Sequence, residues 1–150
     1  MRIKEIMAQP VVTAREQTSL EEIAALMLQH HVGCVPVVDG RGQLCGIITE
    51  SDFAAKEKGV PFSTFRAPQV LGKWLTEKGI ERLYEQARKM TASEIMNTNV
   101  IALAEDEPIE RAVELMLKHD INRIPVLRAR VPVGIVSRHD LLKLLLRKQP

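Results

Sequence analysis

The chain has 150 residues, of which 45% are hydrophobic and 27% charged, and its formal net charge is +2. This composition is ordinary for a globular protein, supports one substantial core and excludes disorder as the default state. So small a net charge argues against binding driven mainly by nucleic-acid phosphates, which requires a concentrated basic face.

Targeting signals and cysteine chemistry restrict the cellular setting. The first ten residues contain no apolar stretch long enough for a signal peptide, and no run approaches the roughly 18 apolar residues of a membrane span. We therefore expect a cytoplasmic chain without membrane contact. Cys34 and Cys45 are expected to be reduced and buried, because two cysteines without a nearby pair of histidines form neither a disulfide framework nor a zinc motif.

The first 53 residues predict a short strand at 11–13, a helix, two strands and the start of a closing helix. Thr18 followed by Glu21 has the spacing of a capping box at the start of the helix. The apolar face of this helix consists of Leu20, Ile23, Ala24, Met27 and Leu28. Residues 35–38 and 44–48 predict a hairpin whose connection, 39–42, contains two glycines that supply positive φ.

The middle of the chain differs in composition from its two flanks. All five aromatic residues lie at its start or inside it: Phe53, Phe62, Phe65, Trp74 and Tyr84. An amphipathic helix is predicted from the spacing of Ile80, Leu83, Tyr84, Ala87 and Met90. We expect a connecting arm that packs on its flanks or on a dimer partner; the alternative is a lid or an effector contact.

The last third predicts the same order of elements. A short strand at 100–101 precedes a helix with Pro108 at its first position, and strands follow at 124–127 and 131–136. Their connection, 128–130, lacks glycine and carries two arginines. The closing helix begins at Ser137, and its broad apolar surface, which suggests burial against another unit, contains Leu141, Leu142, Leu144, Leu145 and Leu146.

The two flanks are copies of one unit. When residues 6–39 are aligned with 95–128, and 46–53 with 134–141, 14 of 42 pairs are identical. A repeat of this length is typically a unit that cannot bury its own apolar face and therefore packs against its twin. The cleft between the copies is the first place to expect a ligand.

Each copy ends in a short polar motif at a helix start, Thr49-x-x-Asp52 or Ser137-x-x-Asp140. A capping box alone explains both motifs, because hydroxyl and carboxylate satisfy free N–H groups. The alternative is a ligand site. A helix start suits a phosphate, and an aspartate accepts hydrogen bonds from two ribose hydroxyls.

The order, spacing and duplication of these motifs resemble a tandem pair of CBS domains, also called a Bateman module. The resemblance implies an α/β fold of two β-α-β-β-α repeats packed about a pseudo-twofold axis, with a helical insert between them. It divides the chain into repeats at 1–55 and 91–150 and an insert at 56–90. It also implies an adenosine-containing ligand (AMP, ADP, ATP or S-adenosylmethionine) between the repeats, no obligatory cofactor, and a homodimer.

The resemblance also implies two sites, each built from both copies. One site combines Ile135, Ser137 and Asp140 with Thr18, Val32 and Gly33, and the other combines Ile47, Thr49 and Asp52 with Glu107, Ile121 and Asn122. At positions where the family has phosphate-binding basic residues, the second copy supplies Arg123 and His139, with Arg138 adjacent.

The first copy has Cys34, Ser51 and Glu50 at the corresponding positions. Because a guanidinium binds phosphate and a carboxylate repels it, the Asp140 site is predicted to bind phosphates more tightly than the Asp52 site.

Catalysis and metal binding are not expected. Ser137, His139 and Asp140 lie too close together at one helix start to form a catalytic triad. His30 and His119 align as residues of a last helical turn, where the helix dipole favours them, so no metal site is predicted.

We therefore expect a regulatory sensor of adenine nucleotides, not an enzyme, that acts through a separate and unknown effector protein. Two alternatives remain. The first is a structural or protein-interaction module without a ligand. The second, ranked last, is a nucleic-acid contact through the basic insert and a basic cluster that comprises Arg128, Arg130, Arg147 and Lys148.

Overall fold

A computed structural model describes residues 1–53, 55–56, 60–61 and 77–146. The first part of the chain forms η1 (Ile3–Glu5), β1 (Ala14–Arg15), α1 (Leu20–His30), β2 (Cys34–Val38), β3 (Leu44–Thr49) and η2 (Glu50–Asp52). Next along the chain come β4 (Ala55–Lys56), β5 (Val60–Pro61) and α2 (Glu77–Arg88). The remainder forms α3 (Ala92–Ile95), β6 (Leu103–Ala104), α4 (Ile109–His119), β7 (Arg123–Arg128), β8 (Val131–Ser137), α5 (Arg138–Leu141) and α6 (Lys143–Leu146).

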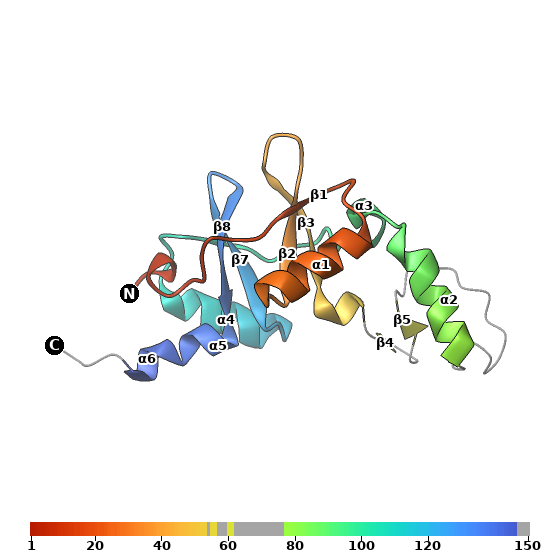
Figure 1. Ribbon diagram of the computed structural model, residues 1–150. Coiled ribbons are helices and arrows are strands. Elements are labelled where there is room, and N and C mark those ends of the chain that lie inside the picture. Colours follow the sequence, from red (N-terminus) through yellow and green to blue (C-terminus); the bar gives the residue numbers. More distant parts are fainter. Residues whose placement is uncertain (54, 57–59, 62–76, 147–150) are drawn as a thin grey trace.

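The two copies have the same sheet topology. In the first, β2 pairs with β1 in parallel and with β3 antiparallel, and in the second β7 pairs with β6 and β8 in the same way. In Figure 1 the β2–β3 and β7–β8 hairpins extend upward, with α1 and α4 below them. The predicted α/β fold of two repeats is therefore confirmed.

Helix boundaries differ slightly from the sequence prediction. Ser19, not Thr18, caps α1, and its Oγ accepts a hydrogen bond from the Glu22 N–H at 3.2 Å. Thr18 Oγ1 instead accepts from the Arg15 N–H at 3.0 Å, so it closes the turn before the helix. Pro108 likewise precedes α4 as its N-cap.

The first strand of each copy lies later in the chain than its β-branched residues predict. The prediction of strands at 11–13 and 100–101 is wrong, because β1 and β6 lie a few residues later. The parallel pairing buries Ala14 and Leu103, at 5% and 1% exposure, whereas Val11 remains only half-buried. The register that fills the core therefore outweighs β-propensity.

Each copy is completed by the segment that precedes the other copy. Ile3, Ile6 and Met7 lie in the core of the second copy, whereas Ala92 and Ile95 lie in the core of the first. Backbone pairs fix the exchange: Ala8 N–H donates to Ile135 O at 2.8 Å, and Ile47 N–H donates to Asn97 O at 3.0 Å. Neither sequence repeat therefore forms its core alone.

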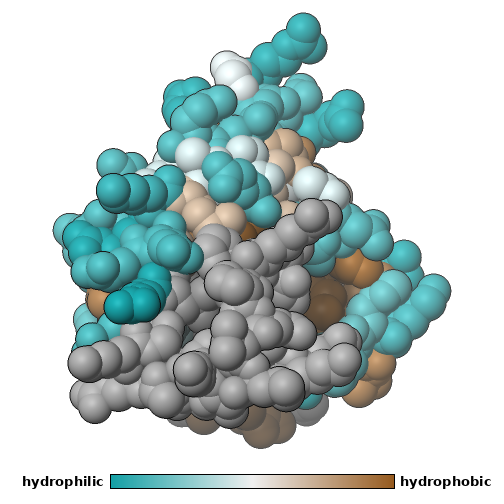
Figure 2. Space-filling model, turned by 90° about the vertical axis from the view of Figure 1, so that its right-hand side faces the viewer, coloured by the Kyte–Doolittle hydropathy of each residue, from teal (hydrophilic) through white to brown (hydrophobic). Residues whose placement is uncertain are grey.

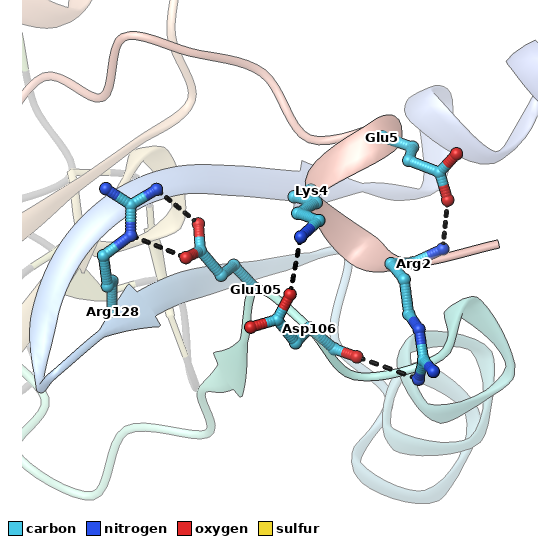
Figure 3. Close-up of polar contacts among 6 residues, drawn as sticks. All are labelled: Arg2, Lys4, Glu5, Glu105, Asp106 and Arg128. Carbon is cyan, nitrogen blue, oxygen red and sulfur yellow. Dashed lines mark hydrogen bonds and ion pairs between the residues drawn. The ribbon is translucent and has the colours of Figure 1, made fainter.

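Polar contacts hold the N-terminal segment against the second copy (Figure 3). Lys4 Nζ contacts Asp106 Oδ1 at 2.7 Å, and the Arg2 guanidinium donates to Asp106 O at 3.0 Å. Beside them, Arg128 makes two hydrogen bonds with Glu105, at 2.6 and 2.8 Å, which hold the pKa of Glu105 below its usual value. Arg128 is thus engaged within the chain, which weakens the nucleic-acid alternative.

Two glycines allow the exchanged segments to approach the sheets. A Cβ at Gly134 would lie 2.6 Å from Met7 Sδ and 3.0 Å from Ala8 O, and one at Gly46 would lie 2.4 Å from Met96 Sδ. We expect Gly134→Ala to lower the free energy of unfolding by about 1–3 kcal/mol, because the core becomes overpacked.

A double-mutant cycle in urea checks this expectation. Met7→Ala removes the side chain that the new methyl group would meet, so the pair Met7→Ala and Gly134→Ala should cost less than the sum of the single changes. Gly40→Ala is the control, because a Cβ there has no neighbour within 4 Å. Additive effects would contradict the packing described.

The two hairpin connections use different residues for positive φ. Gly42 (φ 78°) serves the β2–β3 connection, whereas Ala129 (φ 49°) and Arg130 (φ 68°) serve the β7–β8 connection. Only one of the two glycines expected to supply positive φ does so. Arg130 O also accepts from the Leu44 N–H at 2.9 Å, which joins the hairpins. The guanidiniums of Arg128 and Arg130 therefore do not form one free basic tip, since Arg128 is paired.

The predicted amphipathic helix of the insert corresponds to α2. Ala87 is 2% exposed and packs in the core of the first copy, and Tyr84 donates a hydrogen bond to Phe53 O. The other aromatic residues of the insert, Phe62, Phe65 and Trp74, lie outside the described residues. So do Arg147 and Lys148, on which the nucleic-acid alternative partly rests.

Among the residues that the structure describes, no helix has the length and apolar character needed to cross a membrane. Figure 2 shows hydrophilic residues over most of the upper part of the face that it views, with hydrophobic residues in separate patches lower down.

Candidate ligand-binding site

Both polar motifs cap the helix that follows them. Asp140 Oδ2 accepts hydrogen bonds from the Ser137 N–H at 2.8 Å and from Ser137 Oγ at 2.9 Å. The Asp140 N–H donates back to Ser137 Oγ at 3.2 Å, and Lys143 Nζ lies 2.8 Å from Asp140 Oδ1. In the first copy Asp52 Oδ2 accepts from the Thr49 N–H at 2.8 Å. The two carboxylates are each only 6% exposed, so both are fixed in position.

A cavity of about 400 Å³, here called the Asp140 cavity, lies between the copies. It is lined by eight of the residues predicted for the Asp140 site: Val32, Gly33, Arg123, Ile135, Ser137, Arg138, His139 and Asp140. Thr18 does not line it, because its backbone O accepts from the Ala92 N–H at 2.8 Å, on the side of α1 where the α3 segment packs.

A second cavity of about 360 Å³, the Asp52 cavity, lies at the equivalent position with the roles of the two copies exchanged. Its walls include the predicted residues Ile47, Thr49, Asp52, Ile121 and Asn122. Glu107 is not among them, because its Oε2 accepts from the Ala104 N–H at 2.7 Å in the turn before α4. Asn122 and Arg123 line both cavities.

Sequence reasoning missed residues of two kinds. Val11 and Val12 line the Asp140 cavity, although we had predicted them as a strand. His31 lines the same cavity and Asp120 the other; each is the left-handed residue after its helix, with φ of 53° and 50°. The alignment of the two copies already places His31 opposite Asp120, directly after the repeated helices, and this equivalence could have indicated both residues.

The two cavities carry opposite charge. The Asp140 cavity is lined by Arg123, Arg138 and one carboxylate, together with His31 and His139. The Asp52 cavity is lined by Arg123 and three carboxylates, those of Glu50, Asp52 and Asp120. The Asp140 cavity is therefore the better environment for an anion.

Two ion pairs lie at the boundary of these cavities, and the first of them, between Arg123 and Glu50, crosses between the copies. Arg123 NH2 lies 3.1 Å from Glu50 Oε1, and Arg138 NH2 lies 3.5 Å from Asp120 Oδ1. A Cβ at Gly33 would lie 2.4 Å from Arg123 Cζ, so the absence of a side chain there lets the guanidinium reach Glu50. The arginines predicted for phosphate binding therefore already have carboxylate partners.

Cys34 lies beside Arg123 in the wall of the Asp140 cavity but is only 3% exposed. Burial raises the pKa of its thiol to about 11, and Glu50 adds to this while Arg123 opposes it. The pKa of Cys45 is also raised, by burial and by Glu16. The prediction that both cysteines are reduced and buried holds for Cys34, whereas Cys45 is half-buried.

We expect the native protein to react slowly with thiol reagents at pH 8, and Cys34 more slowly than Cys45. The thiolate is the reactive form, and at pH 8 the Cys34 thiol, with a pKa of about 11, is ionised in only about one molecule in a thousand. Mass spectrometry after timed alkylation measures each site, with urea-unfolded protein as the control. Faster labelling of Cys34 than of Cys45 in the native state would contradict the burial described.

Comparison with known proteins decides the family. The CBS domain model matches residues 3–59 and 92–147, which correspond to the two repeats. The chain belongs to the CBS domain family. CBS domain pairs are typically regulatory modules, which agrees with the expectation of a regulatory protein.

Solved CBS structures share the fold. The CBS domain of a membrane protein from Sphaerobacter thermophilus is 44% identical, with a TM-score of 0.74, over 99% of this chain and 90% of that one. The CBS pair of protein MJ0100, in complex with 5′-methylthioadenosine and S-adenosyl-L-methionine, is 30% identical. Its TM-score is 0.69, over 97% of this chain and 95% of that one.

Curated relatives of the chain differ in length. YhcV from Bacillus subtilis is 30% identical over 139 residues, which are 93% of this chain and 81% of that protein. L-aspartate semialdehyde sulfurtransferase from Methanocaldococcus jannaschii is 32% identical over 143 residues, but the chain spans only 23% of its length.

Within the described residues, no group of three or more His, Cys, Asp and Glu side chains is arranged for a metal ion.

Proposed function

We propose that this CBS pair is a regulatory module that binds an adenosine-containing ligand in the Asp140 cavity and acts through a separate protein. One observation carries the proposal. A buried, positioned carboxylate, Asp140, lies at a helix start in the same cavity as Arg123 and Arg138. Such a set provides an acceptor for ribose hydroxyls next to donors for phosphate.

The chemistry of the walls suggests the orientation of the ligand. Val11, Val12 and Ile135 offer apolar surface for the adenine ring. Asp140 Oδ1, which has one Lys143 partner at 2.8 Å, retains lone pairs for ribose hydroxyls. Phosphates would then face Arg138 and Arg123. This arrangement favours AMP, ADP or ATP, whereas S-adenosylmethionine would use the ribose and adenine contacts alone.

The comparison with MJ0100 supports an adenosine ligand, because both compounds in that complex contain adenosine and that pair is 30% identical to this chain. Helix capping by Asp140 does not exclude ribose binding, since the two roles use different lone pairs of one carboxylate.

A thermal-shift panel tests the proposal. AMP, ADP, ATP, S-adenosylmethionine and NADH are added separately, and a ligand that binds only the folded state raises the unfolding temperature with its concentration. We expect at least one of the adenosine compounds to do so, while guanosine monophosphate at equal ionic strength does not. A folded protein that none of them stabilises would favour the alternative of a structural module.

We also propose that the chain forms a homodimer through α1, α4 and α6. Leu28 and Leu117, at equivalent positions of the repeat, are 78% and 75% exposed, and Leu145 and Leu146 are 82% and 84% exposed. Figure 1 shows these three helices below the hairpins. Burying exposed leucines of this kind against a second copy is favourable.

Sedimentation velocity tests this surface. The combined change of Leu28→Glu and Leu117→Glu should convert a dimer to a monomer, because it places charges in the interface. A monomeric native chain, or a dimer that survives both changes, would overturn the proposed surface.

A further inference from the structure

We infer that Glu50 and Asp120 determine the ligand specificity of the Asp140 cavity, because they hold Arg123 and Arg138 in ion pairs that a phosphate must displace. The inference rests on the proposed function and adds residues outside the ribose-binding helix start. Glu50 and Asp120 belong to the wall of the Asp52 cavity, whereas both arginines line the Asp140 cavity. Two acids of the Asp52 cavity thus restrain arginines that line the Asp140 cavity.

The geometry makes each carboxylate a competitor for phosphate. Arg123 NH2 lies 3.1 Å from Glu50 Oε1 and Arg138 NH2 lies 3.5 Å from Asp120 Oδ1. A phosphate offers the same kind of acceptor with more charge, so it competes with the carboxylate for the guanidinium NH2 group.

Displacement is feasible because both carboxylates face water. The side chains of Glu50 and Asp120 are 65% and 98% exposed, whereas the Arg123 side chain is 32% exposed. Exposed ion pairs are weak, and a released carboxylate is hydrated without loss. The two acids therefore lower phosphate affinity by a limited factor instead of abolishing binding, and they do not affect a ligand without phosphate.

The released carboxylates alter the second cavity. Once Arg123 contacts a phosphate in the Asp140 cavity, Glu50 no longer has that partner, and Asp52 and Asp120 line the same walls. A second phosphate is then disfavoured there, whereas a neutral or cationic adenosine compound is not. By linkage, each ligand changes the affinity of the other by the same factor.

Calorimetric titration of the whole chain tests the inference with AMP and adenosine, which differ only in the phosphate. The combined change of Glu50→Gln and Asp120→Asn should raise AMP affinity by about three- to tenfold, because two exposed ion pairs no longer compete. Adenosine affinity should stay the same. Glu114→Gln is the matched control, since Glu114 Oε2 lies 2.9 Å from Arg111 NH1, and neither residue lines the Asp140 cavity or the Asp52 cavity.

The outcomes separate this inference from the proposed function. If AMP binds but the double variant and Glu114→Gln have the same AMP affinity as the native chain, the inference is wrong and the proposed function stands. An equal rise for adenosine and AMP would also overturn it, because the effect would not depend on phosphate. If no adenosine compound binds either form, both fall together.

Discussion

Asp140→Ala is expected to weaken AMP binding by about 10- to 100-fold, because hydrogen bonds to a charged group contribute about 1.5–3 kcal/mol. Asp52→Ala should change the affinity by less than about threefold, because its cavity has three carboxylates and shares its arginine with the Asp140 cavity. Isothermal titration calorimetry with AMP measures both changes. The asymmetry follows from the charge of the walls, since in both helix starts the aspartate accepts a hydrogen bond from the backbone N–H three residues before it, at 2.8 Å.

Loss of folding must be separated from loss of binding in this comparison. Asp140 caps α5 and pairs with Lys143, so its replacement by alanine should cost about 1–2 kcal/mol of folding free energy. Asp140→Asn keeps the shape and one acceptor oxygen, and Asp52→Asn is its counterpart in the other copy. Circular dichroism establishes that each variant is folded at the titration temperature. Equal affinities for the Asp140 and Asp52 variants would contradict the assignment of the tighter site.

Ile3→Ala and Ile6→Ala are expected to lower the free energy of unfolding by about 2–5 kcal/mol each, because each leaves a cavity in a packed core. Both side chains are nearly inaccessible, at 0% and 2% exposure. Their neighbours are residues of the second copy, including Ile124 and Val136, so each substitution should destabilise the core of the second copy. Urea denaturation measures its size.

Hydrogen exchange locates the effect. Ile3→Ala should reduce amide protection in β7 and β8 more than in β2 and β3, whereas Ile95→Ala should do the reverse, because Ile95 lies in the core of the first copy. Loss of protection in β2 and β3 after Ile3→Ala would be incompatible with the exchanged segments.

Local patterns predicted much of the fold. The apolar spacing of Leu20, Ile23 and Met27 indicated the buried face of α1. Leu28, which belongs to the same predicted face, is instead 78% exposed. Duplication then predicted two identical topologies, and the polar motifs predicted two capped helix starts, both of which the structure contains. These features depend on residues a few positions apart, where spacing and chemistry are sufficient.

Long-range pairings could not be predicted from spacing. Ile6 and Met7 are apolar, which indicates burial, but nothing near them indicates a core about 100 residues away. Arg123 and Glu50 were assigned separately, one as a phosphate ligand and the other as a repelling charge, yet they contact each other at 3.1 Å. Thr18 was assigned by resemblance, and the Asp140 cavity does not include it.

A crystal structure of the chain grown with AMP tests the central claim most directly. The account predicts the ribose hydroxyls on Asp140 and the phosphate on Arg138 and Arg123, with Arg123 withdrawn from Glu50. A ribose on Asp52 with the phosphate in the Asp52 cavity, while the Asp140 cavity holds no nucleotide, would contradict it.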